Sequence, residues 1–286
     1  MHTLLLLLVA VVWGSTFVVI KDSARHVDPF FLVFSRLAIA AAVMALWCAW
    51  RDRSALRNRA AIRFGALLGF LLFCTYASQT IGLKWTTSGH SGFITGTAVV
   101  LVPLILRLLF RAPLARVDYL ASGVVVAGLY LLVYDPSVRI NTGDAITIVA
   151  ALAYAFHLVF GARAVKAAPV KGLVTWQFIF ATLFAGVAFL VAGGRAFEDP
   201  AKALLPIVYL GVIGTLFCYF VSVWAQQFVS PVTVVILFSL EAVFAALFGY
   251  LMSGEKLSTK ELTGAFLIFG GAMGHEIWRV MKRSRQ

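Results

Sequence analysis

Ten long apolar stretches dominate this sequence and restrict what it can fold into. They cover residues 4–20, 30–50, 64–83, 89–110, 117–134, 143–165, 172–192, 204–227, 231–252 and 261–281. A transmembrane helix needs about 20 apolar residues, whereas the strands of a membrane barrel alternate in polarity over about ten residues. The sequence therefore predicts an all-α polytopic membrane protein with ten transmembrane helices.

The composition excludes the common soluble classes. Hydrophobic residues make up 62% of the 286 residues and charged residues only 13%, against about 45–50% and about 25% in soluble domains. The connections between the stretches are too short for a separate catalytic or nucleotide-binding domain. The cysteines Cys48, Cys74 and Cys218 lie inside apolar stretches without metal-binding spacing, so we expect no disulfide, metal or cofactor.

The basic residues indicate how the chain is oriented. If the N-terminus is cytoplasmic, the cytoplasmic loops carry 15 Lys and Arg residues and the opposite loops carry 8. Lys and Arg collect in cytoplasmic loops, so both termini are predicted to lie inside the cell. This asymmetry accounts for the net charge of +12 without a nucleic-acid partner.

The chain divides into two similar halves, residues 1–142 and 143–286. Leu114 and Asp118 precede the fifth stretch as Leu257 and Glu261 precede the tenth, and both pairs are 143 residues apart. Each half holds five spans, an odd number, so the second half must be inverted relative to the first. Inverted repeats are typical of secondary transporters, which bind substrate near the midplane between the halves.

Four polar aromatic residues occur at unusual depth. Trp and Tyr normally lie at the membrane interfaces, but Trp13, Tyr76, Tyr154 and Tyr219 lie near the middle of their stretches. They form two pairs at the repeat spacing, since 154 − 13 = 141 and 219 − 76 = 143. A buried N–H or O–H needs a partner in hydrocarbon, so each ring either bonds a neighbouring helix or lines a cavity. As a set, we interpret them as the wall of a substrate cavity.

Hydrogen-bonding side chains accompany these rings. Gln79 and Thr80 share a helical face with Tyr76, and Ser222 and Gln226 share one with Tyr219. An inverted repeat places one such polar cluster toward each side of the membrane. A lone Ser, Thr or His can equally serve helix packing. The predicted substrate-binding residues are Trp13, Thr16, Tyr76, Gln79, Tyr154, His157, Tyr219 and Ser222.

Two charged residues lie within the apolar stretches. Arg36 is close to the outer end of the second stretch, and we expect its side chain to extend to that interface. Glu241 lies in the middle of the ninth stretch, where insertion of the charge costs about 2.5–3.5 kcal/mol. It must be protonated, partnered or exposed to a wet cavity. Glu241 is therefore a candidate proton carrier or a structural hydrogen-bonding acid.

Pairs of glycines four residues apart predict close contacts between helices. Three such pairs occur, Gly65/Gly69, Gly92/Gly96 and Gly270/Gly274. Small residues allow two helix backbones to approach each other within the membrane. In a transporter, such contacts can also slide.

Several motifs resemble those of one transporter family. They are Trp13-Gly-Ser-Thr-Phe17, Gln79-Thr-Ile-Gly-Leu83, Gly92-Phe-Ile-Thr-Gly96 with Val102-Pro103, and Leu240-Glu-Ala-Val-Phe-Ala-Ala-Leu247 closing at Gly254-Glu255. The whole chain resembles the EamA branch of the drug/metabolite transporter superfamily, and it is most similar in pattern to YddG-type exporters of aromatic and other amino acids. The resemblance implies ten helices, cytoplasmic termini and export of small metabolites. Ala242 stands where the family usually has proline, so no kink is implied there.

These features favour a secondary exporter that works by alternating access in a bacterial-type inner membrane. A wall of rings with few fixed charges suits small amphipathic solutes, so we expect broad export of amino acids, aromatic ones included, and of similar metabolites. The chain has no phosphate-binding loop and no hydrolase motif. Two alternatives remain, a membrane enzyme acting on lipid or isoprenoid substrates and a channel.

Overall fold

The computed structural model describes residues 1–23, 26–86, 88–133, 141–193, 196, 200–253 and 257–283. Every regular element in this part of the chain is a helix, which confirms the predicted all-α class. Five of the basic residues that indicate the orientation lie outside the described residues, as does the Gly254-Glu255 motif. These five are Arg25, Arg139, Arg195, Lys256 and Arg285.

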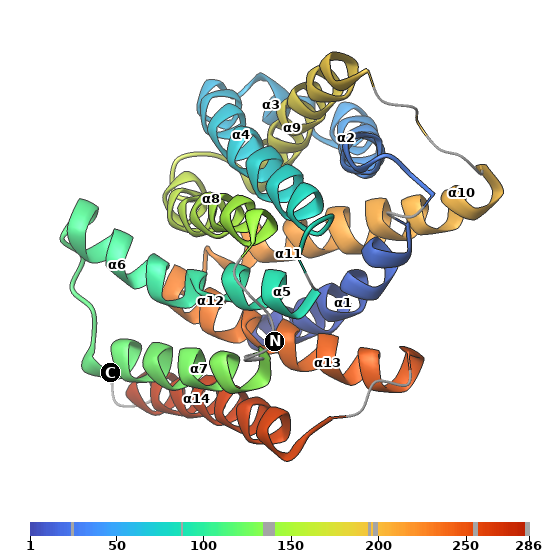
Figure 1. Cartoon of the computed structure of the whole chain (residues 1–286). Coiled ribbons are helices and arrows are strands. Elements are labelled where there is room, and N and C mark those ends of the chain that lie inside the picture. Colours follow the sequence, from blue (N-terminus) through green and yellow to red (C-terminus); the bar gives the residue numbers. More distant parts are fainter. Residues whose placement is uncertain are drawn as a thin grey trace.

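The helices follow the predicted stretches, with some stretches divided into shorter helices (Figure 1). The first half of the chain forms α1 (His2–Ser23), α2 (Pro29–Arg51), α3 (Arg53–Arg57), α4 (Arg59–Gly82), α5 (Ser88–Gly96), α6 (Ala98–Phe110) and α7 (Arg116–Val133). The second half forms α8 (Thr142–Ala164), α9 (Val170–Ala192), α10 (Pro200–Tyr209), the π-helix η1 (Leu210–Phe217), α11 (Cys218–Ala225), α12 (Pro231–Phe238), α13 (Leu240–Ser253) and α14 (Thr259–Arg283).

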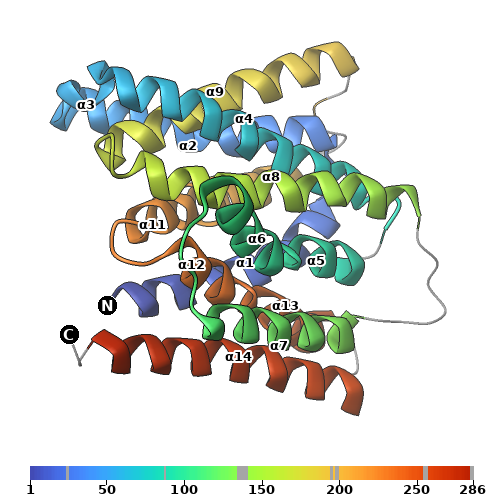
Figure 2. The same cartoon turned by 90° about the vertical axis from the view of Figure 1, so that its left-hand side faces the viewer.

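Nine helices of the described chain are long and apolar enough to cross a membrane. They coincide with the first nine predicted stretches, taking α5 with α6, α10 to α11, and α12 with α13 as single spans. The tenth stretch forms α14, a helix of 25 residues. Polar residues such as His275, Glu276 and Arg279 lower its mean hydropathy. α14 packs along α7, as Figure 2 shows.

Short polar side chains set several helix starts. The Asp28 carboxylate accepts hydrogen bonds from the Phe30 and Phe31 N–H groups at the start of α2, as expected of an N-cap. Asn141 and Asp144 form a reciprocal capping box at the start of α8. Asp52 caps α3, and hydrogen bonds from the Ser54 hydroxyl and the Ala55 N–H hold the pKa of its carboxyl below the ordinary value.

The two halves of the chain are interlaced. The most extensive packing joins α4 to α8 and α9, α2 to α9, α7 to α14, and α1 to α13. Each of these pairs takes one helix from each half (Figure 1). The halves therefore bury their surfaces against each other, so neither is a separate globular domain.

The three predicted glycine pairs differ in how closely atoms of other helices approach them. At Gly69 a Cβ would lie 2.6 Å from the Gln177 carbonyl oxygen, so α4 and α9 approach closely there, as predicted. A Cβ at Gly96 would meet Leu129 Cδ1 at 2.9 Å, whereas Gly92 has no atom nearer than 3.9 Å. The prediction for Gly270 and Gly274 is wrong, because a Cβ at either position would meet no atom within 4 Å.

The close face of α14 lies at different glycines from those predicted. A Cβ at Gly264 would lie 2.5 Å from the Gly128 carbonyl oxygen, and one at Gly271 would lie 2.9 Å from Val125 Cγ2. Both contacts are to α7. The spacing of Gly264 and Gly271 is two helical turns, about 3.6 residues each, so they share one face of α14.

Two of the spans are interrupted near their middle. Thr97 separates α5 from α6, and its hydroxyl donates to the Ile94 carbonyl oxygen at 2.5 Å. Ser239 separates α12 from α13, and its hydroxyl donates to the Ile236 carbonyl oxygen at 2.6 Å. A hydroxyl that bonds the carbonyl three residues earlier competes with the helical backbone bonds. α5 and α6 contact α13 and α12 respectively, so the two interruptions come together inside the bundle.

Candidate functional site

A cavity lies among the helices where the interrupted spans meet, and it encloses about 440 Å³ of space including its open part. Its lining residues come from both halves of the chain. They are Trp13, Thr16, Phe17, Ile20, Arg36, Thr75, Tyr76, Gln79, Thr95, Tyr154, Tyr219 and Glu241. Of the residues predicted as a site, this cavity brings together Trp13, Thr16, Tyr76, Gln79, Tyr154 and Tyr219, with the candidate acid Glu241. His157 and Ser222 do not line it.

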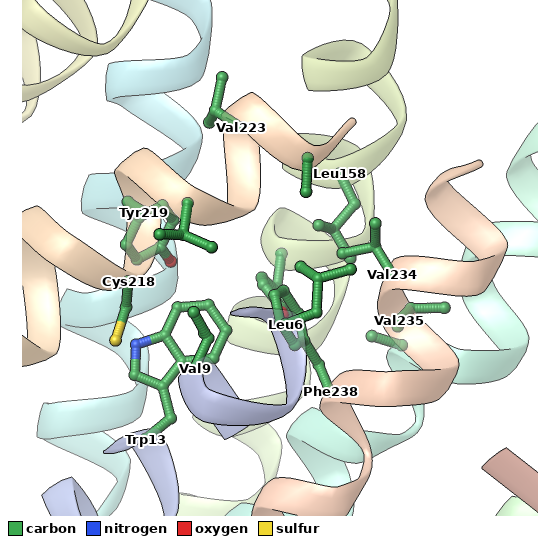
Figure 3. Close-up of a cluster of buried hydrophobic side chains, with 14 of the residues drawn as sticks. Leu6, Val9, Trp13, Leu158, Cys218, Tyr219, Val223, Val234, Val235 and Phe238 are labelled. Atoms are coloured by element: carbon green, nitrogen blue, oxygen red, sulfur yellow. The ribbon is translucent and has the colours of Figure 1, made fainter. Parts of the chain in front are cut away.

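The four deep aromatic rings contact one another. The Trp13 ring centroid lies 5.3 Å from that of Tyr219 and 6.2 Å from that of Tyr154, and Tyr76 meets Tyr219 edge-on at 5.7 Å. Figure 3 shows Trp13 of α1 beside Tyr219 and Cys218 of α11 and near Phe238 of α12. Edge-to-face contacts between rings are favourable because each ring edge is positive and each face negative.

The indole N–H of Trp13 bonds the protein itself. Its Nε1 donates to the Gly214 carbonyl oxygen at 2.9 Å. Gly214 belongs to η1, where the helix widens to i→i+5 bonding, and such π-helical turns occur frequently at functional sites. The polar atom of Trp13 is therefore satisfied by η1, while part of its ring lines the cavity.

Arg36 does not extend to the membrane interface, so the expectation that it does is wrong. Its side chain is 2% exposed and points into the bundle. Nε donates to Thr215 Oγ1 at 2.8 Å, and Nη2 donates to the Tyr76 hydroxyl at 3.1 Å. The guanidinium also lies 4.0 Å from the Tyr76 ring centroid. Hydrogen bonds and a ring contact inside the bundle thus replace the water that an interface would supply.

Glu241 occupies the first turn of α13, directly after the interruption at Ser239. Glu241 lines the central cavity and also a second, neighbouring cavity of about 270 Å³ including its open part, and Thr95 and Tyr154 line both. Within the described residues, the Glu241 carboxylate makes no hydrogen bond and no ion pair. A buried acid must be protonated, partnered or in contact with a wet cavity. The position of Glu241 fits contact with a cavity.

Hydroxyl and amide groups complete the cavity wall. Gln79 Nε2 donates to Thr95 Oγ1 at 3.5 Å, which is a long hydrogen bond. Thr16 and Thr95 donate their hydroxyl protons to backbone carbonyls of their own helices at 2.7 and 2.8 Å. The Tyr154 hydroxyl is buried without a hydrogen bond to any residue that the structure describes. A ligand or water can meet it.

A second polar cluster lies behind the Tyr219 ring, and we call it the polar file. It consists of His157, Gln177, Ser222 and Gln226, each at most 4% exposed. His157 Nε2 and Gln177 Oε1 are 3.2 Å apart, and the His157 ring meets Tyr219 at 5.3 Å. Five polar atoms of the file have no partner in the described chain: His157 Nδ1, Gln177 Nε2, Ser222 Oγ, and Oε1 and Nε2 of Gln226. His157 and Ser222 are therefore buried beside the cavity and belong to this file.

Five residues of the cavity lining were not among the predicted site residues: Phe17, Ile20, Arg36, Thr75 and Thr95. Arg36 and Thr215 form one polar corner next to Tyr76, although Thr215 itself is not part of the lining. Phe17 and Thr95 belong to motifs in the family resemblance, and Thr95 is also a polar residue inside an apolar stretch. Thr215 carried no signal, because a single threonine in an apolar stretch is more often structural.

Comparison with known proteins gives a consistent result. The sequence pattern of the EamA-like transporter family matches residues 1–134 and again residues 141–275. A protein of Archaeoglobus fulgidus named an uncharacterized transporter is 30% identical over 265 residues, which cover 92% of this chain and 82% of that protein. The uncharacterized transporter YdfC of Bacillus subtilis is 25% identical over 91% of this chain and 85% of its own length.

Two further similarities are to an inner membrane protein and to a solved structure. The uncharacterized inner membrane transporter YedA of Escherichia coli is 23% identical over 88% of this chain and 82% of its own length. A solved crystal structure superposes with a TM-score of 0.79 over 95% of this chain and 94% of that one, at 18% identity, which shows a shared fold. The family pattern and the relatives together show that this chain belongs to the EamA-like transporter family.

Proposed function

We propose that this protein is a secondary exporter of amino acids, aromatic ones included, and of similar small metabolites. The observation that carries the proposal is the central cavity, whose wall combines four polar aromatic rings with amide and hydroxyl groups. Such a wall suits solutes with an apolar part and a polar end. The enzyme alternative gains nothing from this geometry, because no nucleophile and base approach each other in the cavity wall as described.

Ten spans in two inverted halves are part of this proposal. Both termini lie at the same end of the bundle, on the side of α3 (Figure 2), as an even number of crossings requires. The family pattern matches twice, in residues 1–134 and 141–275. The interruptions at Thr97 and Ser239 are 142 residues apart, since 239 − 97 = 142. Interrupted spans at corresponding positions of two repeats are the usual mark of a transporter's binding site.

The helix caps support the same division at residues 142 and 143. Asp118 accepts a hydrogen bond from the Ala115 N–H in the first turn of α7, and Glu261 accepts one from the Ser258 N–H before α14. Both acids bond the backbone three residues earlier, and the two acids are 143 positions apart, since 261 − 118 = 143. Local structure is therefore repeated at the same register.

Alternating access requires a path on each side of the cavity. Ser222 and Gln226 follow Tyr219 toward the C-terminal end of α11, and five polar atoms of the polar file are buried without a partner in the described chain. Burying such atoms is unfavourable unless they are hydrogen-bonded, so we infer that the file is hydrated in another conformation. In that conformation it forms the path to the cytoplasm. The inner membrane is the proposed location, as for the relative YedA, with both termini cytoplasmic.

Counterflow in proteoliposomes tests the proposed function. Vesicles containing the purified protein are loaded with unlabelled phenylalanine, and uptake of labelled amino acids is measured against protein-free vesicles. Transient accumulation of labelled phenylalanine and of several other amino acids is expected. Absence of exchange for every amino acid, from protein that is folded by its melting curve, contradicts the proposal.

The energy source is tested in the same vesicles. Transport that follows the solute's own gradient should be unchanged by an imposed pH gradient, because no proton then crosses with the substrate. Flux that rises with the pH gradient, and loses this dependence in Glu241→Gln, would instead identify Glu241 as a proton carrier.

A further inference from the structure

We propose that Arg36 and Glu241 hold the two charged ends of a zwitterionic substrate, the carboxylate at Arg36 and the ammonium at Glu241. The inference rests on the proposed function and assigns its substrate class. It starts from the charges of the cavity. Among the described residues that line the cavity, these are the two charged side chains, and they have opposite sign.

Neither side chain has a counter-ion among the residues that the structure describes. Arg36 bonds the hydroxyls of Thr215 and Tyr76, which are both neutral. Glu241 makes no hydrogen bond or ion pair within the described chain, and the two side chains do not come within 4 Å of each other as an ion pair would. Buried charges are normally paired. The cavity therefore presents one basic and one acidic side chain, each without a counter-ion in the described chain, to whatever enters it.

The Arg36 corner suits a carboxylate. Nε and one Nη2 proton are in use, so three of the five N–H donors of the guanidinium make no hydrogen bond to a described residue. A guanidinium binds carboxylates through two parallel hydrogen bonds. The Tyr76 hydroxyl accepts from Nη2 and helps to fix the orientation of the guanidinium. Thr215 holds the guanidinium in place from η1.

The Glu241 end suits an ammonium. Glu241, Thr95 and Tyr154 each line both cavities. The unpartnered Tyr154 hydroxyl provides a further acceptor there. Tyr76 and Tyr219 line the same cavity as Arg36 and Glu241. The side chain of a substrate held at both charged ends would therefore lie against these rings.

Recognition of both ends selects for substrates that carry both charged groups. An amine without a carboxylate leaves Arg36 unpaired, and an acid without an amine leaves Glu241 unpaired. A site built to pair polar groups rejects analogues that lack one of them. The rings would contact only the apolar part of the substrate, so they discriminate little among substrate side chains. The site should therefore be strict about the zwitterion and tolerant of the side chain.

The test is competition in counterflow of labelled L-phenylalanine. The competitors are L-phenylalanine, phenethylamine, 3-phenylpropionate and L-phenylalaninamide. With the wild-type protein, unlabelled phenylalanine should compete at least about tenfold better than each of the other three, as expected for one lost charge-assisted bond. Equal competition by the analogues overturns the inference, and it does so without any variant.

Two variants test which residue binds the carboxylate and which binds the ammonium of the substrate. Arg36→Gln should weaken phenylalanine binding and abolish its advantage over phenethylamine and phenylalaninamide. Glu241→Gln should abolish its advantage over 3-phenylpropionate. Arg57→Gln and Glu261→Gln make the same chemical changes at sites outside the cavity and should leave the order of competitors unchanged. Equal weakening of all ligands by a cavity variant would show a structural role only and would contradict the assignment.

The two proposals fail in different ways. Exchange of phenylalanine without discrimination among its analogues refutes the zwitterion site and leaves the export function standing. Folded protein that exchanges no amino acid refutes both. Melting curves in detergent establish folding. If Arg36→Gln does not fold, Arg36→Lys tests the same corner, because it keeps the charge but loses the paired N–H donors, and the advantage of phenylalanine over phenethylamine should fall.

Discussion

At the level of single residues, Trp13 and Tyr76 differ in what a substitution would report. Trp13 is 7% exposed, belongs to the main hydrophobic core and bonds Gly214. Its replacement by alanine would remove core packing worth about 3–5 kcal/mol, so lost transport would not identify a cavity role. The Tyr76 hydroxyl projects to Arg36, and it can be removed while the ring remains.

Tyr76→Phe is therefore the sharper variant. The hydroxyl accepts from a charged group, and such a bond contributes about 1.5–3 kcal/mol. If it positions Arg36 for the substrate, the half-saturating concentration of phenylalanine should rise about tenfold or more in protein that is still folded by its melting curve. Tyr250→Phe, at a residue 51% exposed, is the matched control. Identical kinetics for the two variants would show that the Tyr76 hydroxyl takes no part in binding.

At the level of elements, close backbone contacts and interrupted spans shape the site. Glycines bring α7 against α14 at Gly128 and Gly264, and α4 against α9 at Gly69. Interruptions at Thr97 and Ser239 place Thr95 and Glu241 at the ends of short helices beside the cavity. The rigid contacts hold the frame, while the interrupted spans supply side chains to the cavity.

Gly264→Ala and Gly270→Ala form a matched pair on α14. A methyl group at Gly264 would meet the Gly128 carbonyl oxygen at 2.5 Å, whereas one at Gly270 would meet nothing within 4 Å. Overpacking costs about 1–3 kcal/mol, so Gly264→Ala should lower the melting temperature in detergent. Gly270→Ala should leave it unchanged or raise it, because alanine is the better helix former. The reverse order would refute the assigned α14 face.

Ser222 provides a test of the proposed path to the cytoplasm, which is closed in the conformation described. It is 1% exposed, so Ser222→Cys, in a protein whose native cysteines are replaced, should resist an impermeant maleimide in the conformation described. Alternating access requires that a second conformation wets the polar file, so labelling from the cytoplasmic side should occur slowly and respond to added substrate. Ser122→Cys, equally buried at 3% in α7, should stay unlabelled. Labelling of both residues at one rate, or of neither, would contradict the proposed path.

At the level of the whole molecule, the two halves of the chain interlace, so neither half forms a domain of its own. α1, α2, α4 and α7 each pack chiefly against helices of the second half. The cavity receives side chains from both halves for the same reason. Relative movement of the halves would therefore change the cavity wall on both sides, as alternating access demands.

Topology is the prediction that belongs to this scale. The 15 basic residues in one set of loops against 8 in the other predict that both termini lie in the cytoplasm. A reporter that is active only in the cytoplasm, fused after Gln286, should be active, and one that is active only in the periplasm should be silent. A fusion after Phe110, before the cytoplasmic loop to α7, should behave like the C-terminal one. A periplasmic signal at Gln286 would refute both the orientation and the inverted repeat.

The sequence by itself determined the helices, their approximate bounds and the depth of Trp13, Tyr76, Tyr154 and Tyr219. These properties depend on the length of apolar runs and the distance of a residue from their ends, and both are local. Glu241 could also be identified, because an acid in mid-span has few physical alternatives.

Only the tertiary structure decided which way each residue points. It turned Arg36 inward to Tyr76, separated His157 and Ser222 from the cavity wall, and placed the close face of α14 at Gly264 instead of Gly270. In a soluble helix the apolar stripe marks the buried face. In a membrane, lipid-facing and protein-facing surfaces are equally apolar, so hydrophobic periodicity does not fix the rotation of a helix about its axis. That rotation is set by packing between helices far apart in the sequence.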